Sequence, residues 1–473
     1  MQNSSFSSSC PECAALRAEV AALKQLVEGL KQELAQTQEQ LAKATRNSFN
    51  SSKPPSSDIV KPPKSAPKKR GKRRRGGQPG HPRYEHHFRP EEIDVTHTHR
   101  LEACPQCQGS HLVPLPGAEQ TAYQYELVER PILLHAHQRQ AGWCAQCNQV
   151  HFAPLSDPVE KGGVVGPRLT ALIGYLKGGC HLSYRNLQAL LGDAFAVRLC
   201  TGLLTKTIQK VSAALEAPYV QLGSTLPQQK VCNIDETSHP ENRQTLWNWV
   251  FRAPTFTLFT IETSRGAEVL EKALGEECEA VLGHDYYSAY RAYMKRAPVT
   301  VQFCLAHLIR EARFLAQSSD AVIANYGQRV LEGLKKIFRL IHRRDQLKPE
   351  NFQRKIEQER DAFLTMARRT RAGGEAATLA QRFRTHGRQY FTFITDPDIE
   401  PTNNVAERAL RFCVIDRRLT QGTRSLLGRQ WCERVWTTIA TCTQQGRSAF
   451  QFIAQAVKAH FTGMPAPSLL TKT

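Results

Sequence analysis

The stretch VCNIDET at residues 231–237 decides the fold, because it joins a buried-strand pattern to an acidic end. The run from Val231 to Ile234 is mostly apolar, and Asp235 and Glu236 follow it directly. A strand end lets a carboxylate meet solvent without the full cost of burying its charge. We therefore expect a strand that carries Asp235 at its end.

The segments that follow alternate between strand-like and helix-like patterns. In chain order they predict strands at 246–252 and 256–261, a helix at 266–273, a strand at 280–283, a helix with tyrosines at 286, 290 and 293, a strand at 299–303 and a helix at 305–315. With the first strand, this is the element order of a ribonuclease-H-like core. It predicts Asp235 and Asp285 at the ends of the first and fourth strands.

Length and charge limit what kind of protein this is. The 473 residues suffice for about three domains, and a net charge of +20 favours a polyanionic partner. The polar start MQNSSFSSS predicts no signal peptide, and no run approaches the roughly 18 apolar residues of a membrane span. The 14 cysteines suit a reducing cytoplasm, with the paired ones as metal ligands rather than disulfides.

Residues 1–45 predict a coiled coil. Apolar residues follow alternating three- and four-residue steps, with Thr37 in one slot: Leu16, Val20, Leu23, Val27, Leu30, Leu34 and Leu41. We favour self-association through this seam over a helix that packs on its own chain. Cys10 and Cys13 supply only two ligands, so they either share a zinc ion with a second copy or are free thiols.

Residues 46–90 form a basic linker that cannot fold alone, because Pro, Ser, Gly, Lys and Arg dominate it. Between residues 53 and 75, ten basic side chains stand against one acid, Asp58, and supply a net +9 of the chain's +20. We expect phosphate contact from a flexible arm, with a solvated linker as the alternative. The DNA-binding residues predicted here are Lys68, Lys69, Arg70, Lys72, Arg73, Arg74 and Arg75.

Four cysteines within residues 91–160 predict a structural zinc site. Cys104 and Cys107 form one CxxC pair, and Cys144 and Cys147 form another, with 36 residues between the pairs. Two such pairs match tetrahedral zinc. Strand-like runs at 122–128 and 132–136 would supply the strands of a small zinc ribbon. A closed site of this kind holds structure together and does no chemistry.

Residues 161–225 predict helices. A break at Gly192 and Asp193, between helices at 182–191 and 201–215, allows a helix-turn-helix that binds DNA; a plain helical connector explains the pattern equally well. Residues 226–425 would hold the catalytic domain, with a helical insertion at about 316–395, and residues 426–473 the C-terminal helices.

The core needs a third acid, and Glu407 in TNNVAERALRF (402–412) is the leading candidate. Asn404 is the predicted N-cap of this helix, so a capping box between Asn404 and Glu407 is the competing interpretation. Arg408, Arg411, Arg417 and Arg418 surround the acid, which fits a DNA-facing surface.

The ordered motifs resemble those of bacterial transposases of the insertion sequence sixty-six family, an Asp-Asp-Glu group. Besides the zipper-like start and the two CxxC pairs, the matching blocks are NSFNSSKPPSSD (47–58), RRRGGQPGHPR (73–83), CHLSYR (180–185), IDET (234–237), HDYYSAY (284–290), CLAHLIREARF (304–314), TNNVAERALR (402–411) and GRSAFQFIAQAV (446–457). The resemblance covers nearly the whole chain and implies that Asp235, Asp285 and Glu407 are the catalytic triad. One block departs from the family pattern at Leu305 and Leu308, so no role is carried over to His307.

Three carboxylates suit Mg²⁺ or Mn²⁺, and two such ions can drive an in-line displacement at phosphorus. The resemblance thus implies a magnesium-dependent transposase with structural zinc, which binds its element ends and target DNA. It would nick DNA to free 3′-hydroxyls and join them to the target. It further implies a homodimer or higher oligomer, possible accessory proteins of the same element, and a place at the nucleoid of a bacterial cytoplasm. The alternatives are a ribonuclease-H-like nuclease and a catalytically silent DNA-binding regulator; the three acids argue against the second.

Overall fold

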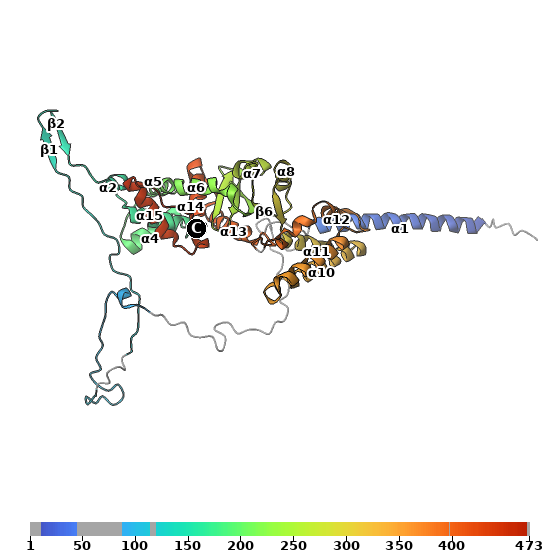
Figure 1. Cartoon of the computed structure of the whole chain (residues 1–473), viewed down its shortest axis with the longest axis horizontal. Helices are drawn as coiled ribbons and strands as arrows, with labels where there is room; N and C mark the ends of the chain where they lie inside the picture. The colour runs from blue at the N-terminus through green and yellow to red at the C-terminus, as the bar shows by residue number, and fades with distance from the viewer. Residues whose placement is uncertain (1–10, 45–87, 114–119, 397, 471–473) are drawn as a thin grey trace, which may run out of the picture. The chain divides into compact units, whose positions relative to one another are not determined.

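The computed structural model describes residues 11–44, 88–113, 120–396 and 398–470 (Figure 1). The chain divides into two units, residues 61–133 and the remainder, and each is described by itself. Cys10 and the basic residues between 53 and 75 lie outside the described residues. None of the described helices is long and apolar enough to cross a membrane.

The predicted N-terminal helix is present as α1 (Pro11–Ala44), 34 residues long. Its heptad residues are all exposed. The helix is therefore confirmed, whereas its pairing with another helix remains a prediction.

The strands predicted at 122–128 and 132–136 are wrong: the structure has no strand there. Tyr125 and Leu134 are 83% and 92% exposed, so their apolar surface has no layer to pack against, and a strand without a ladder partner is not stable. The only regular element described in residues 88–113 and 120–133 is η2 (Pro90–Glu92). A hairpin follows instead, with β1 (Ala141–Cys144) antiparallel to β2 (Gln149–Phe152).

The predicted helical region contains α2 (Asp157–Gly162), α3 (Pro167–Gly178), α4 (Tyr184–Phe195), α5 (Thr201–Ala214) and α6 (Glu216–Thr225). The break predicted at Gly192 and Asp193 is wrong, because α4 continues through both residues. The helix ends instead at Ala196, which adopts the left-handed conformation of a helix C-cap. The connection to α5 is therefore residues 196–200.

A mixed sheet forms the centre of the larger unit. Its strands are β3 (Val231–Glu241), β4 (Gln244–Arg252), β5 (Thr257–Glu262), β6 (Val281–His284) and β7 (Thr300–Phe303), in the order β5-β4-β3-β6-β7. The first three strands are antiparallel, and β3, β6 and β7 are parallel. The helices α7 (Ala267–Leu274), α8 (Ser288–Arg296) and α9 (Leu305–Ala316) alternate with the last strands. The predicted order of elements is confirmed, and the fold is mixed α/β.

The edge of the sheet at β5 is closed by side chains of α14 (Leu426–Gln444). The backbone N–H groups of Thr257, Phe259 and Ile261 donate to Thr441 Oγ1, Thr437 Oγ1 and Glu433 Oε1, at 3.1, 3.0 and 2.7 Å. Alternate strand residues and every fourth helix residue advance by similar lengths, about 7 and 6 Å, so one helix can satisfy several strand donors. This arrangement covers an edge that could otherwise pair with another strand.

The chain between β7 and the last helices is helical, as predicted. It contains α10 (Ala321–Ile341), α11 (Pro349–Ala367) and α12 (Gly374–His386). Then come α13 (Asn404–Thr420), α14 and α15 (Ala449–Thr462). Of these, α13 packs against β3 and β4, which brings the end of the chain back to the strand that carries Asp235.

Candidate active site

The two predicted aspartates lie side by side because of the sheet register. β3 and β6 are parallel neighbours in which Asn233 is paired with Gly283. Asp235 and Asp285 each follow two residues later, so they lie side by side on neighbouring central strands.

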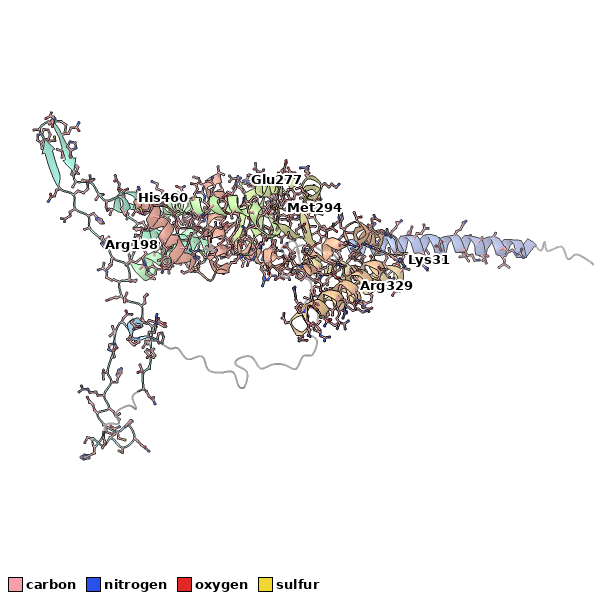
Figure 2. The ribbon with its side chains drawn as sticks, in the orientation of Figure 1. Lys31, Arg198, Glu277, Met294, Arg329 and His460 are labelled. Carbon is pink, nitrogen blue, oxygen red and sulfur yellow. The ribbon has the colours of Figure 1, made fainter. Side chains whose placement is uncertain are left out.

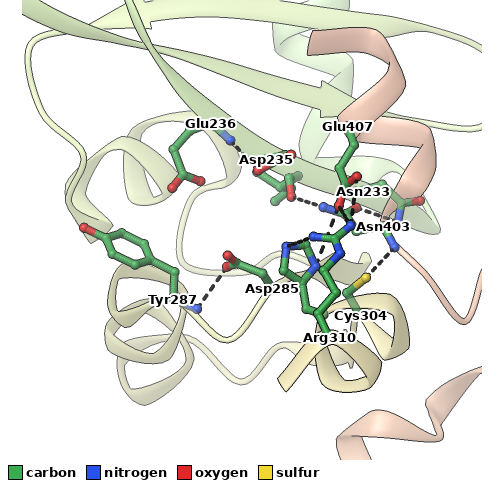
Figure 3. A network of polar contacts seen from close by, with 11 residues as sticks. Asn233, Asp235, Glu236, Asp285, Tyr287, Cys304, Arg310, Asn403 and Glu407 are labelled. Carbon is green, nitrogen blue, oxygen red and sulfur yellow. Dashed lines mark hydrogen bonds and ion pairs between the residues drawn. The ribbon is translucent and has the colours of Figure 1, made fainter. Parts of the chain in front are cut away.

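The prediction that Asp235 ends its strand is wrong, because pairing with β4 carries β3 on to Glu241 and Asp235 itself is paired with Val250. Asp285 directly follows the last residue of β6, as predicted. Figure 3 shows the two carboxylates near each other, and electrostatic coupling between them agrees with their closeness.

Burial raises the pKa of Asp235 well above its ordinary value, and the negative charges of Glu236, Asp285 and Glu407 raise it further. Burial, with the charge of Glu236, raises the pKa of Asp285 to about 7. Each aspartate accepts one backbone N–H at 2.9 Å, Asp235 from Glu236 and Asp285 from Tyr287. The carboxylates of Asp235 and Asp285 thus repel one another when both are charged.

Glu236, next to this pair, is bound by Arg265 and Tyr290. Its Oε1 accepts from Nε and Nη2 of Arg265 at 2.9 and 2.7 Å, and its Oε2 accepts from the Tyr290 hydroxyl. The side chain is 2% exposed, and the Arg265 guanidinium also lies over the ring of Tyr287. Arg265 therefore forms an ion pair with Glu236 and orders the region beside the aspartates. Nothing in the sequence around Arg265 pointed to this contact.

Glu407 lies in the first turn of α13, and the competing interpretation of a capping box between Asn404 and Glu407 is wrong. The N-cap is Asn403 rather than Asn404, and no side-chain bond caps the helix. Glu407 is therefore the fourth residue of the helix, one position beyond that of a capping-box acid. Its carboxylate therefore does not cap the helix.

Asn403 connects α13 to the strand that carries Asp235. Its Nδ2 donates to the carbonyl of Ile234 at 2.7 Å, and its Oδ1 accepts from Asn233 at 3.1 Å. Its backbone N–H contacts Cys304 Sγ at 3.1 Å. These contacts, drawn in Figure 3, fix the start of α13 one residue from Asp235 along β3. Because such contacts join residues far apart in sequence, no local pattern could have indicated them.

Arg310 and His307 of α9 approach Glu407. Arg310 Nη2 lies 3.3 and 3.5 Å from the two carboxylate oxygens, and His307 Nδ1 lies 3.7 Å from one of them. Burial, with the charge of Arg310, lowers the pKa of His307 to about 4, so its imidazole is neutral at pH 7. Arg310 is thus the charge partner of Glu407 in this structure.

Two other polar residues near Asp235 support the fold. His239 is buried, and its Nε2 lies 3.1 Å from Thr423 Oγ1. Arg417 does not belong to the predicted DNA-facing surface, because its guanidinium is half-buried and donates to Ser238 and Thr237 of β3. Arg408 and Arg411 are exposed on α13, as a DNA-facing surface requires.

The two CxxC pairs fall in different units of the chain. Both make the same turn: Gln108 and Asn148, each directly after the second cysteine, have φ values of 60° and 53°. In both pairs, backbone N–H groups that include that of the second cysteine lower the pKa of the first, Cys104 or Cys144. Stabilised thiolates suit metal ligands.

The donor set of the acidic site fits a hard divalent cation. Carboxylates whose charges raise one another's pKa gain from a shared positive charge, and oxygen is the donor that Mg²⁺ prefers. Within the described parts of the chain, no three or more His, Cys, Asp and Glu side chains are spaced to enclose a metal ion. The acids therefore do not form a closed coordination sphere.

The chain is similar to known proteins over most of its length. A family described as Transposase IS66 family matches residues 162–430, and a family of unknown function (DUF6444) matches residues 5–87. The Uncharacterized protein y4hP of Sinorhizobium fredii is 23% identical over 380 residues, which cover 72% of this chain and 67% of that protein. Because the first match spans more than half of the sequence, the chain belongs to the IS66 transposase family.

Proposed function

We propose that this protein is a DNA transposase whose catalytic acids are Asp235, Asp285 and Glu407. One observation carries the proposal: the register of β3 and β6 brings the two aspartates side by side, and Asn403 attaches the helix of Glu407 to β3 next to Asp235. The surrounding sheet and helices would be a ribonuclease-H-like core. Its substrates would be the element ends and target DNA in a bacterial cytoplasm.

Mg²⁺ or Mn²⁺ held by these acids would supply the positive charge that phosphoryl transfer requires. Asp235, central among the acids, would be shared by two ions, with Asp285 and Glu407 each holding one. Water would attack the phosphodiester first and break its P–O3′ bond, which frees a 3′-hydroxyl and leaves a 5′-phosphate. That hydroxyl would then attack a phosphodiester of the target strand, form a new P–O3′ bond and release the target's own 3′-hydroxyl. No side-chain nucleophile is needed for either displacement.

Basic side chains that precede and follow the three acids in the sequence would bind the DNA. Arg408 and Arg411 are exposed one and four residues after Glu407, near enough for phosphate contact. Burial lowers the pKa of Arg252, and the positive charge of nearby Arg408 lowers it further. The linker residues between 53 and 75 would add contacts that carry little sequence information.

A structural zinc ion is the second metal that we propose, held by Cys104, Cys107, Cys144 and Cys147. The left-handed conformation that directly follows each cysteine pair supports it. Purified protein should contain about one zinc per chain. Elemental analysis of a Cys104→Ser/Cys144→Ser variant should find that zinc lost; zinc content equal to wild type would remove the assignment.

The test of the function is Asp235→Asn, assayed with DNA that flanks the gene, in Mg²⁺. Asparagine keeps the shape of aspartate and loses the charge, so it is a poor ligand for a hard cation. Binding to element ends should survive, whereas nicking and joining should disappear. Asp345→Asn, at an exposed position in the helical insertion, is the matched control and should keep full activity.

The alternatives give different products. A ribonuclease-H-like nuclease would cut RNA–DNA hybrids and would not join element ends. A silent regulator would bind the ends, with wild type and Asp235→Asn equally inactive. Strand transfer by wild type alone supports the transposase.

A further inference from the structure

Two guanidinium groups lie over the ring of Tyr286, the residue directly after the second aspartate. The Cζ atoms of Arg291 and Arg382 are 4.7 and 4.3 Å from the ring centre. Arg291 belongs to α8, whereas Arg382 belongs to α12 in the helical insertion. Figure 2 shows the side chains of both parts, with Met294 labelled on α8 and Arg329 on α10 of the insertion. The contacts over this ring therefore connect the insertion to the turn that carries the aspartate.

Other side chains fix the positions of Arg382 and of the ring. Arg382 Nη1 donates to Glu311 Oε2 at 2.7 Å and to the Tyr390 hydroxyl at 3.3 Å. The ring of Phe303, the last residue of β7, packs edge-on against the Tyr286 ring, with centroids 5.1 Å apart. Because the Arg382 side chain is 14% exposed, water screens its attraction to the ring only weakly.

This arrangement costs stability. Within the part of the chain that the structure describes, the Nε atoms of Arg291 and Arg382 are buried and have no hydrogen-bond acceptor. A buried donor without an acceptor costs free energy, and two like charges over one ring repel each other. Apolar side chains could pack the ring of Tyr286 without either cost. A costly polar arrangement beside candidate catalytic residues is expected where it serves function rather than stability.

The turn that carries the aspartate belongs to no strand or helix. Residues 285–287 lie between the end of β6 and the start of α8. Within the turn, the N–H of Tyr287 donates to Asp285 Oδ1 at 2.9 Å, as drawn in Figure 3. Arg265 lies over the ring of Tyr287, 3.9 Å from its centre. The conformation of the turn thus depends on the contacts that its two tyrosine side chains make.

We propose that Arg291 and Arg382 are positioning residues that hold Tyr286 and thereby fix the carboxylate of Asp285 in the active site. The helical insertion then acts on catalysis through Arg382, which sets the geometry of an acid that precedes the insertion in sequence. This inference rests on the proposed function, in which Asp285 is a ligand of Mg²⁺ or Mn²⁺. A loosened turn lets Asp285 move and weakens the site for the metal.

Four variants separate the ring contacts from side-chain bulk. Arg382→Met removes the cation and keeps a long side chain, and Tyr286→Leu removes the ring that both cations contact. Tyr286→Phe keeps that ring and should match wild type. Arg384→Met, at an exposed position on α12, is the matched control. Because Arg382→Met takes a charge partner from Glu311, Arg382→Met/Glu311→Gln removes both charges and replaces the single variant if that one unfolds.

The first measurement is amide hydrogen exchange of the full-length protein without DNA or metal, so it does not depend on the proposed function. A cation–π contact changes a local equilibrium by about three- to thirtyfold. Exchange in residues 285–287 should therefore accelerate by that factor in Arg382→Met, and by more in Tyr286→Leu. Residues 231–241, and both Tyr286→Phe and Arg384→Met, should exchange like wild type. Wild-type exchange of the turn in Tyr286→Leu, or equal acceleration in Tyr286→Phe, overturns the proposal.

The second measurement separates positioning from a loss of stability. Mn²⁺ binding is measured by calorimetry, and nicking rates are measured over a range of Mg²⁺ concentrations. In Arg382→Met, the Mn²⁺ dissociation constant and the half-saturating Mg²⁺ concentration should rise about three- to thirtyfold, with binding to element-end DNA unchanged. Partial unfolding would instead lower the maximal rate at an unchanged half-saturating concentration.

The two measurements distinguish this proposal from the proposed function. Wild-type metal dependence in both Arg382→Met and Tyr286→Leu overturns the positioning role. If the exchange result holds but wild type neither binds Mn²⁺ nor nicks DNA, the proposed function fails and the positioning of Asp285 by the insertion stands.

Discussion

At the scale of single residues, Glu407 differs from the two aspartates because the positively charged side chain of Arg310 already pairs with it. Replacing Glu407 by Gln keeps an acceptor for Arg310 and removes the negative charge. The Arg310–Glu407 pair is only about one-fifth exposed on each side, so we expect a stability loss on the order of 1–3 kcal/mol. Nicking and joining should be abolished. Thermal melting and strand transfer, measured side by side on the same preparation, check both parts.

The control for that prediction is Asn404→Ala. A helix cap lost at this position would cost about 0.5–2 kcal/mol, but Asn404 does not cap α13, so the melting temperature should not change. Near wild-type activity in Glu407→Gln would exclude Glu407 as the third acid. The search would then move to Asp396, Asp398 and Glu400, which precede the helix.

Glu433 gives a prediction for pH dependence away from the catalytic acids. Burial, with the charge of Glu262, raises its pKa to about 7, while its Oε1 accepts the N–H of Ile261. Between pH 4.5 and 7 the unfolded chain releases a proton that the folded chain keeps, so wild-type stability falls as pH rises through this window. Glu433→Gln keeps an acceptor and removes the charge.

We expect Glu433→Gln to be similar to wild type near pH 4.5 and more stable at pH 8, by on the order of 1–3 kcal/mol. Thermal melts at the two pH values check this. Glu276→Gln, at an exposed position, should follow the wild-type trend. A stability difference between wild type and Glu433→Gln that does not change with pH would contradict the prediction.

At the scale of elements, the contact between β3 and β6 depends on a glycine. A Cβ atom on Gly283 would lie 2.2 Å from Nδ2 of Asn233, the donor to Asn403. Gly283→Ala should therefore displace Asn233, weaken the attachment of α13 and cost roughly 1–3 kcal/mol. Activity should fall by more than stability, because Glu407 depends on that attachment.

Gly223→Ala, in α6, is the matched control. A Cβ there meets nothing within 4 Å, so the change should be neutral or stabilising by about 0.5–1 kcal/mol. Chemical denaturation and strand transfer of both variants provide the comparison. If Gly283→Ala were as stable and active as wild type, Asn233 would not be needed to position α13.

The same scale shows what the sequence could predict. Periodicity gave the order of the strands and helices from β3 to α9, because local patterns determine which face is buried. It gave the wrong cap for α13, since Asn403 and Asn404 are adjacent and only contacts with Asn233 and Ile234 distinguish them. Periodicity also predicted strands at 122–128 and 132–136, where apolar and polar residues alternate but no other described sheet or helix packs against them. Arg265 and Arg310 were missed as charge partners because their acids are distant in sequence.

At the scale of the whole molecule, charge is distributed unevenly. Residues 61–75 hold nine Lys and Arg and no acid, although they are only a small part of a chain with 63 Lys and Arg. Where Z phosphates are neutralised, the logarithm of affinity falls with the logarithm of salt concentration with a slope of about −0.9Z. A segment this basic should dominate that slope.

Deleting residues 61–75 should therefore weaken binding to element-end and unrelated DNA alike, and should reduce the magnitude of the salt slope by roughly 3 to 8. The lower value corresponds to about a third of the nine charges in contact with phosphate.

Because deletion also shortens the linker, replacing the seven basic residues at 68–75 by Gln at constant length is the control and should reproduce most of the effect. Arg408→Gln/Arg411→Gln should lower the slope by no more than about 2, since only two charges are lost. Titrations at several salt concentrations measure all four slopes. A deletion variant with the wild-type slope would mean that the linker does not touch phosphate, and would leave the surface of α13 as the main source of the salt dependence.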